Sequence, residues 1–350
     1  MAGSEYERTI ADVGELELIA LIEPYLVRTL SQNVIVGPGD DAAVVTCGSN
    51  NNAFAVLTCD MLVEGVHFPD RSSAPWRLIG RKAMTSNVSD VAAMAGNPRY
   101  ALISLGLPRE LHVGAVLELY TGMAEIAGEH GFSLVGGDTV ASPVVIISIA
   151  LLGERQACFR NALRSNCRPG QWLYVSGHLG ASRAGLELLL DKNLSGQIPS
   201  SLAERLIQRQ LNPTAHVALG QALAVRFADL AMIDISDSLW NELGILSKCS
   251  GVSIEVWADA IPIAKEVRKF CTTLGRDPLE YALFSGEEYE LLFACTADDE
   301  EIHACIKDLA KPVSITKIGQ IKEPPPAVRL IGEAGQSLEV RDKTFQHFLS

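Results

Sequence analysis

The sequence contains none of the common glycine-rich phosphate-binding loops. Neither G-x-x-x-x-G-K-[ST] nor a strand followed by G-x-G-x-x-G occurs among its 350 residues. The turn that begins at Gly37 contains Asp40 and Asp41, whose negative charges would repel a pyrophosphate. If this protein binds a nucleotide, a different kind of site must therefore hold the phosphates.

Long apolar runs, an excess of basic residues and paired cysteines are absent as well. No stretch of 18 apolar residues occurs, and the N-terminal residues lack the basic and apolar regions of a signal peptide. The eight cysteines include no C-x-x-C pair, so we expect reduced thiols in a cytoplasmic protein. The formal net charge of −13 argues against a nucleic-acid partner, and nothing indicates a membrane.

Strand-like and helix-like segments are mixed in both halves of the chain, which predicts an α/β or α+β fold. Since aromatic residues make up only 6% of the sequence, Val, Ile, Leu and Ala must fill most of the interior. At roughly 150 residues per domain the length predicts two domains, and a polar stretch rich in Arg and Asn that begins at Arg155 divides them into 1–154 and 155–350. The expected helices span about 15–30, 76–95, 111–130, 183–190, 202–210, 215–227, 237–248, 264–274 and 299–309. The expected strands span 53–60, 100–105, 132–135, 144–152, 172–175, 231–235, 252–256, 290–295 and 313–320, with a turn at 136–139.

Aspartates recur where these predicted elements begin or end. They are Asp40, Asp41, Asp60, Asp90, Asp138, Asp234 and Asp237. A carboxylate at the end of a buried strand costs free energy unless a cation meets it. Mg²⁺ takes carboxylate oxygens and completes its shell with water and substrate phosphates. If these side chains converge, they would hold more than one ion.

Each aspartate also has a purely structural explanation. Asp40, Asp41 and Asp138 suit turns, and a residue such as Asp237 could be a helix N-cap. Asp60 and Asp90 could be solvated surface acids. The residues alone leave both interpretations open.

Three further segments have two interpretations each. The glycine-rich stretch 176–185, SGHLGASRAG, could hold an anion on backbone N–H groups or could only allow close packing. The acids of 286–291, GEEYEL, could orient a cationic or hydroxylated substrate or could line a sheet edge. His67 could be a zinc ligand or a structural residue, and the lack of a second His or Cys at zinc-ligand spacing favours the structural role.

Six segments, taken in order, resemble the thiamine-monophosphate kinase family. They are GPGDDAA (37–43), TCDMLVEGVHF (58–68), NVSDVAAMA (87–95), GGDT (136–139), DISDSL (234–239) and GEEYEL (286–291). The resemblance extends over residues 15–348. It implies a two-domain aminoimidazole ribonucleotide synthetase-like fold, with an N-terminal mixed sheet that forms a homodimer interface and a C-terminal α/β domain. It also implies ATP-dependent phosphorylation of thiamine monophosphate to thiamine diphosphate.

The resemblance assigns roles to individual residues. The implied magnesium ligands are Asp40, Asp41, Thr58, Asp60, Asp90, Asp138, Asp234 and Asp237. The implied ATP contacts are Tyr120, Gly137, Asp138, Arg164 and Ser236, with Arg164 clamping a phosphate. The implied substrate contacts are His67, Glu287 and Phe345, with Phe345 stacking on a thiamine ring. Among these, Asp41, Asp138, Arg164 and Asp237 are the implied catalytic residues.

The chain departs from the family pattern at four positions, none of which is among the residues just named. Cys59 stands where Thr is usual, Ser238 and Ser285 replace glycines, and Glu288 replaces Asp. Two other functions remain open. One is a different ATP-using enzyme of the superfamily, such as an aminoimidazole ribonucleotide synthetase-like or selenophosphate synthetase-like protein. The other is a catalytically silent nucleotide-binding protein.

Overall fold

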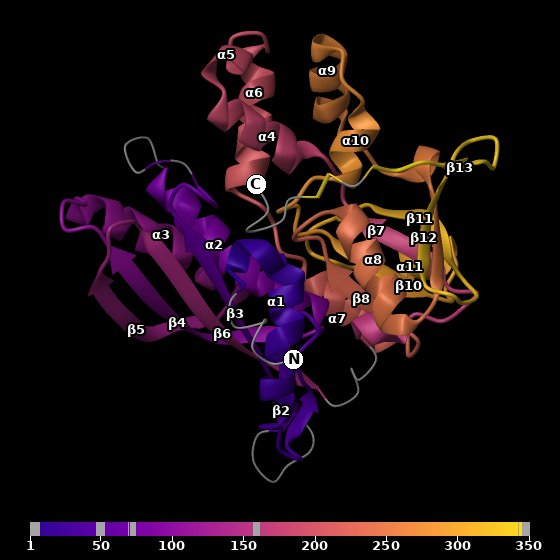
Figure 1. Ribbon diagram of the computed structural model, residues 1–350, viewed down its shortest axis with the longest axis horizontal. Helices are drawn as coiled ribbons and strands as arrows, with labels where there is room; N and C mark the ends of the chain where they lie inside the picture. Colours follow the sequence, from indigo (N-terminus) through magenta and orange to yellow (C-terminus); the bar gives the residue numbers. More distant parts are fainter. Residues whose placement is uncertain are drawn as a thin grey trace.

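Two β-sheets, one in each half of the chain, organise the molecule (Figure 1). The computed structural model describes residues 8–46, 53–68, 70, 75–156, 162–341 and 343–344. Among these residues there is no helix with both the length and the apolar character that a membrane crossing requires. The α/β class predicted from the sequence is confirmed.

The first sheet is mixed and has six strands in the order β1-β2-β3-β6-β4-β5. β4 and β5 are parallel, and the other neighbours are antiparallel. In sheet order the strands are β1 Val34–Val36, β2 Ala43–Thr46, β3 Ala53–Val63, β6 Ile146–Gln156, β4 Asn97–Leu107 and β5 Ser133–Ala141.

One face of this sheet is covered and the other is not. Apolar side chains of the covered face pack against helices α2 (Trp76–Ala93) and α3 (Val113–His130). Helix α1 (Ile10–Val27) leaves most of its apolar side chains exposed. The opposite face of the sheet exposes Leu57, Met61, Tyr100, Leu102, Val135 and Val140. Exposed apolar patches of this kind are typical of protein contact surfaces.

The turn predicted at 136–139 is wrong, because β5 runs straight through these residues. Gly137 pairs with Ile103 of β4, and a Cβ atom at Gly137 would lie only 1.7 Å from the carbonyl oxygen of Ile103. Gly137 therefore allows a close approach of the two strands, and the segment is not a chain reversal. Asp138 is a strand residue, not a turn former.

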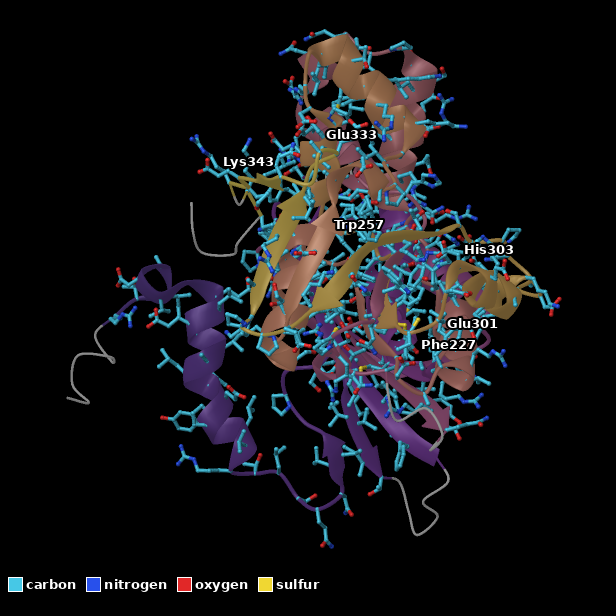
Figure 2. The ribbon with its side chains drawn as sticks, turned by 90° about the vertical axis from the view of Figure 1, so that its right-hand side faces the viewer. Phe227, Trp257, Glu301, His303, Glu333 and Lys343 are labelled. Atoms are coloured by element: carbon cyan, nitrogen blue, oxygen red, sulfur yellow. The ribbon has the colours of Figure 1, made fainter. Side chains whose placement is uncertain are left out.

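The second sheet has seven strands in the order β13-β12-β9-β11-β7-β10-β8. Only β9 and β12 are parallel to each other. In sheet order the strands are β13 Ser337–Leu338, β12 Ala327–Ile331, β9 Ser253–Trp257, β11 Ile315–Lys322, β7 Trp172–Ser176, β10 Leu291–Cys295 and β8 Ala231–Asp234. Figure 2 shows Trp257, at the end of β9, near the middle of this half, with Glu301 and His303 of α11 at its outer side.

Helices cover both faces of the second sheet. One face packs against α4 (Ala181–Leu190), α6 (Ser200–Leu211), α8 (Leu239–Ser250), α9 (Lys265–Leu274) and α10 (Pro278–Leu283). The other face packs against α7 (Val217–Arg226) and α11 (Asp299–Ile306). The remaining helical elements are α5 (Lys192–Ser195) and two 3₁₀ turns, Arg164–Asn166 and Ala258–Ala260. Figure 1 shows α4–α6 and α9–α10 rising side by side above this sheet.

Helix α2 joins the two halves. It contacts β3 and α3 on one side and α7 and β8 on the other, so most of its residues are buried. A helix enclosed in this way needs no polar stripe of its own. Its polar residues, among them Lys82, Asn87, Ser89 and Asp90, therefore lie between the two sheets.

Candidate active site

Three of the predicted aspartates meet where the two halves join. Asp41 lies just before β2, Asp90 lies near the end of α2, and Asp234 ends β8. One carboxylate oxygen from each lies within 4.8 Å of one from each of the others. Residues nearly two hundred positions apart thus form one acidic cluster, which we define as Asp41, Asp90 and Asp234.

The acidic cluster is electrostatically costly without a cation. Burial, with the charges of Asp60 and Asp234, raises the pKa of Asp90 well above its ordinary value. Burial and the charge of Asp41 also raise the pKa of Asp234 well above its ordinary value. The same two causes raise the pKa of Asp40 to about 7. The second carboxylate oxygen of Asp41 is buried and accepts no hydrogen bond. Carboxylates crowded in this way fit a divalent cation.

Neighbouring polar groups fix the orientation of these carboxylates. The Thr58 hydroxyl donates to Asp90, and the Ser89 hydroxyl donates to Asp234 at 2.5 Å. The backbone N–H of Asp60 donates to the side-chain carbonyl of Asn87 at 3.1 Å, which holds β3 against α2. The ligand set is therefore oriented by the protein before any ion binds.

Arg164 is the cation that meets the cluster. Its Nη2 atom lies 2.6 Å from Asp41, and its backbone N–H donates to Asp40 at 3.2 Å. Burial alone would lower the pKa of Arg164, but the charges of Asp41 and Asp40 raise it above its ordinary value. A guanidinium that is always charged and partly exposed is suited to bind a phosphate.

A cavity of about 540 Å³ adjoins the cluster. The predicted site residues that line it are Asp60, His67, Asp90, Ser236, Asp237 and Glu287. Its apolar wall includes Val66, Leu186, Leu190 and Phe284. Residues predicted for metal, nucleotide and substrate therefore share one cleft.

The loop before α8 holds Ser236 and Asp237 in that cleft. The N-cap of α8 is Ser238, which accepts from the backbone N–H of Asn241 at 3.1 Å, so Asp237 is not the cap. Behind the loop, buried Glu242 accepts from the backbone N–H groups of Asp237 and Ser238 at 2.9 and 3.0 Å. Burial, with the charge of Asp237, raises the pKa of Glu242 to about 8.

Among the predicted residues that the structure describes, Tyr120, Gly137 and Asp138 do not line this cleft. Tyr120 is partly buried on α3, and Phe345 lies outside the described residues. Asp138 is exposed and lies on the open face of the first sheet. In the strand pairing it is opposite Ser104 of β4, which is opposite Ser148 of β6, which is opposite Met61 of β3. Three strand spacings separate it from β3, roughly 14 Å. Within one chain, Asp138 does not reach the acidic cluster.

Comparison with known proteins identifies the family. The domain family described as AIR synthase related protein, N-terminal domain, matches residues 39–154. Thiamine-monophosphate kinase of Aquifex aeolicus (strain VF5) is 42% identical over 284 residues, which cover 81% of this chain and 86% of that protein. The chain belongs to the thiamine-monophosphate kinase family. The Bacillus subtilis (strain 168) member of this family is 34% identical over 95% of this chain and 99% of its own.

Solved structures of the thiamine-monophosphate kinase family have the same fold. The structure of AaThiL complexed with AMPPCP and TMP matches with a TM-score of 0.81 and 35% identity, over 98% of this chain and 99% of that one. A crystal structure of thiamine monophosphate kinase from Aquifex aeolicus matches with a TM-score of 0.75 and 32% identity, over 95% and 100%. The predicted family fold is thereby confirmed.

The backbone N–H groups of the glycine-rich turn before α4 donate to a side chain of the same chain, the carboxyl group of Glu288. Glu288 accepts from the backbone N–H groups of Gly180 and Ser182 at 2.7 and 3.2 Å, and from the Ser285 hydroxyl at 2.6 Å. The positive end of the α4 dipole is thus neutralised internally. Two positions that depart from the thiamine-monophosphate kinase pattern, Ser285 and Glu288, contact each other here.

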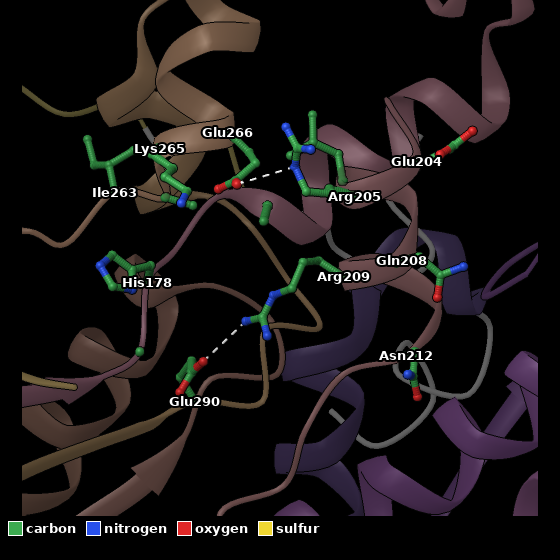
Figure 3. Close-up of a pocket in the computed structure, with 14 residues that line it drawn as sticks. His178, Glu204, Arg205, Gln208, Arg209, Asn212, Ile263, Lys265, Glu266 and Glu290 are labelled. Carbon is green, nitrogen blue, oxygen red and sulfur yellow. Dashed lines mark hydrogen bonds and ion pairs between the residues drawn. The ribbon is translucent and has the colours of Figure 1, made fainter. Parts of the chain in front are cut away.

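A larger cavity, of about 930 Å³, lies between α6 and α9 and contains none of the predicted site residues (Figure 3). Glu290 is one of the residues that line this cavity. The Glu290 carboxylate lies 3.2 Å from Arg209, 2.7 Å from His216 and 2.5 Å from the Ser176 hydroxyl. Although burial opposes ionisation, these partners, His216 first among them, lower the pKa of Glu290 to about 2. This carboxylate joins β7, β10, α6 and the start of α7.

We predict that Glu290 makes the fold sensitive to acid. Because folding lowers its pKa from 4.5 to about 2, its stabilisation is present above pH 4.5 and is lost as the pH falls toward 2. The difference amounts to about 3 kcal/mol. Urea unfolding between pH 6 and pH 2 should show a shallower loss of stability for Glu290→Gln than for the wild type. Glu204→Gln, at an exposed residue of the same cavity, is the control, and equal pH slopes for all three proteins would contradict the prediction.

Sequence reasoning missed several residues of the site. Ser89, Gln210 and Glu242 orient other site residues through hydrogen bonds, and the sequence carries no signal for such contacts. The same holds for Lys82, which follows Arg81 in the helix predicted at 76–95 and looks there like an ordinary charged residue.

Proposed function

We infer that this protein transfers the γ-phosphoryl group of ATP to thiamine monophosphate, giving thiamine diphosphate and ADP. The inference rests on one observation above all. In a member of this family, the acidic cluster lies against the same cleft as His67 and Glu287. The cleft thus combines groups suited to phosphates with an apolar wall suited to an organic ring.

We propose that Asp41, Asp90 and Asp234 hold magnesium. Asp40, Thr58, Asp60 and Asp237 would complete the set, which is large enough for more than one ion. The donor chemistry fits, since carboxylate oxygens predominate and a buried oxygen of Asp41 accepts no hydrogen bond. When bound, Mg²⁺ supplies the positive charge that neutralises the phosphate oxygens.

The residues of the chain would position the two phosphate groups and neutralise their charge, and none of them would have to abstract a proton. The acceptor phosphate is already an anion, so the reaction needs no strong base, but two anions must approach each other in line. Arg164 would clamp a phosphate of ATP, with Ser236 and Gly137 as further contacts and Tyr120 at the border of the nucleotide. The polar groups that fix the aspartates keep this environment preorganised.

The cleft would recognise the organic part of the acceptor. His67 and Glu287 supply polar contacts, and the apolar wall with Leu186 and Phe284 excludes water from the reacting phosphates. Phe345 would stack on a thiamine ring. We propose a cytoplasmic location for this chemistry.

We further propose that the protein is a homodimer that pairs through the open face of its first sheet. The apolar side chains on that face would then be covered, as a stable interface requires. Asp138 lies on this face, away from its own cluster. Asp138 and Gly137 would therefore serve the site of the second copy.

The direct test is an assay of the purified protein with Mg-ATP and thiamine monophosphate. We expect thiamine diphosphate in the product analysis and a loss of at least about 100-fold when EDTA removes divalent cations. Turnover of ATP with another acceptor but not with thiamine monophosphate would instead indicate a different enzyme of the superfamily. ATP binding without any turnover would indicate a silent nucleotide-binding protein.

A further inference from the structure

Lys82 is a lysine buried at the centre of the molecule. Its side chain is 1% exposed and extends from α2 toward the substrate cleft. Lysines are almost never fully buried unless they are paired. Here the ammonium lies 2.5 Å from a carboxylate oxygen of Glu287 and donates to the carbonyl oxygen of His67 at 3.1 Å. Lys82 therefore links two residues of the cleft that come from distant loops.

Glu287 is fixed on all sides by contacts of this kind. Its other carboxylate oxygen accepts from the side-chain amide of Gln210 at 2.6 Å, and Gln210 is itself 1% exposed. Its backbone N–H donates to the carbonyl oxygen of Ser236 at 2.6 Å. Its φ angle of +57° places a non-glycine residue in the left-handed region, a conformation that persists only where surrounding contacts hold it.

The carboxylate nevertheless remains available to the cleft. The Glu287 side chain is 24% exposed and lines the 540 Å³ cavity, whereas Lys82 does not line it. Lys82 can thus act on a bound molecule only through its neighbours. It neutralises Glu287, so the carboxylate offers its free lone pairs to an N–H or O–H donor without adding an uncompensated negative charge beside an anionic acceptor.

We propose that Lys82 is a positioning residue that determines acceptor recognition, by holding Glu287 and His67 in the geometry that binds the donor-bearing organic end of the acceptor. This inference rests on the proposed function, in which the acceptor is a phosphate monoester with a polar ring system. It assigns to α2 a second role: the end of the helix carries Asp90 for the phosphates, and its middle carries Lys82 for the acceptor.

The test compares Lys82→Met and Lys82→Arg in steady-state kinetics. Methionine keeps most of the volume and removes the charge and the donors. We expect Lys82→Met to raise KM for thiamine monophosphate by about 10- to 100-fold and to leave KM for ATP within about twofold, since a displaced contact group costs up to about 10²-fold. Lys82→Arg should recover part of the loss. An equal rise in both KM values, or a fall in kcat alone, would overturn the inference.

Lys317→Met is the matched control. Lys317 pairs with Asp299 at 2.9 Å on the second sheet and lies outside the cleft, so both KM values should stay at the wild-type level. The double variant Lys82→Met/Glu287→Gln adds a second criterion. Because Lys82 acts in part through Glu287, the double variant should weaken acceptor binding by less than the product of the two single effects, whereas fully multiplied effects would refute a shared pathway.

Two further measurements keep the test decisive. If Lys82→Met does not fold, Gln210→Met removes the other anchor of Glu287 and should show the same selective rise in KM for the acceptor. Calorimetric Kd values for thiamine monophosphate, measured without ATP, separate this inference from the proposed function. A wild type that binds the acceptor 10-fold or more tightly than Lys82→Met supports the role of Lys82 even without turnover. Equal Kd values, or a wild type that binds no thiamine monophosphate, overturn it.

Discussion

Replacing Asp90 with asparagine is expected to lower kcat by about 10²–10³-fold, the usual cost of losing one preorganised charge contact in an active site. The same change should raise the melting temperature of the metal-free protein by roughly 3 °C. The asparagine side chain would keep the volume and still accept from Thr58, but one of three crowded charges would be gone. Activity and metal-free stability should therefore move in opposite directions.

The sign of the pH dependence follows from the same repulsion. Because burial raises the folded-state pKa of Asp40 to about 7, and those of Asp90 and Asp234 also rise, the folded protein binds more protons than the unfolded chain above about pH 4. Metal-free stability should then fall as the pH rises toward 7, by about 1.4 kcal/mol per pH unit for each such group. Added Mg²⁺ should remove this loss.

Thermal unfolding between pH 5 and pH 8, with EDTA or with Mg²⁺, measures both effects. Asp308→Asn provides the control, because Asp308 is an exposed acid just after α11 and takes no part in the cluster. If Asp90→Asn retains near-normal turnover and the full Mg²⁺-induced stabilisation, the metal role proposed for Asp90 is wrong.

Mixing two inactive variants, Asp41→Asn and Asp138→Asn, is expected to restore roughly a quarter of wild-type activity. Each homodimer would lack one essential carboxylate at both of its sites. In a mixed dimer, the Asp138→Asn chain would keep its own Asp41 and receive an intact Asp138 from the other chain. Half of the dimers would be mixed after random exchange of subunits, and one of their two sites would be complete.

A matched mixture shows whether the exchange is specific. Asp41 and Asp234 belong to the same cluster of the same chain, so mixing Asp41→Asn with Asp234→Asn should restore no activity. Light scattering of the wild type should give twice the mass of one chain. A monomer in solution, or complementation that is equally absent from both mixtures, would contradict the proposed origin of Asp138.

The sequence predicted the elements that local signals define. The helix expected at 76–95 is α2, and it ends near Gly96 as the glycine and the following Asn97-Pro98 indicate. The aspartates of the cluster were also predicted, because acids beside buried strands are costly unless they bind something. What these signals could not give is the partner of each acid, since Asp41, Asp90 and Asp234 meet only after both sheets have formed.

The wrong or missing predictions depend on contacts between distant segments. Gly136-Gly137 looks like a turn until β4 pairs with it, when the missing side chain of Gly137 becomes a requirement for close pairing. The short strand β12 forms because β9 offers an edge to pair with, and β13 in turn pairs with β12. Lys82 and Glu287 each look like an ordinary charged residue, and only the tertiary fold makes them an ion pair.

Glu288 has a consequence for how such a protein would behave in a cell. A phosphate that approached the start of α4 would have to displace a competitor tethered to the same chain, which never diffuses away. Free phosphate and sulfate should therefore be poor inhibitors there. With that site occupied, the phosphates of a nucleotide would have to be held elsewhere, by Arg164 and by divalent ions at the acidic cluster.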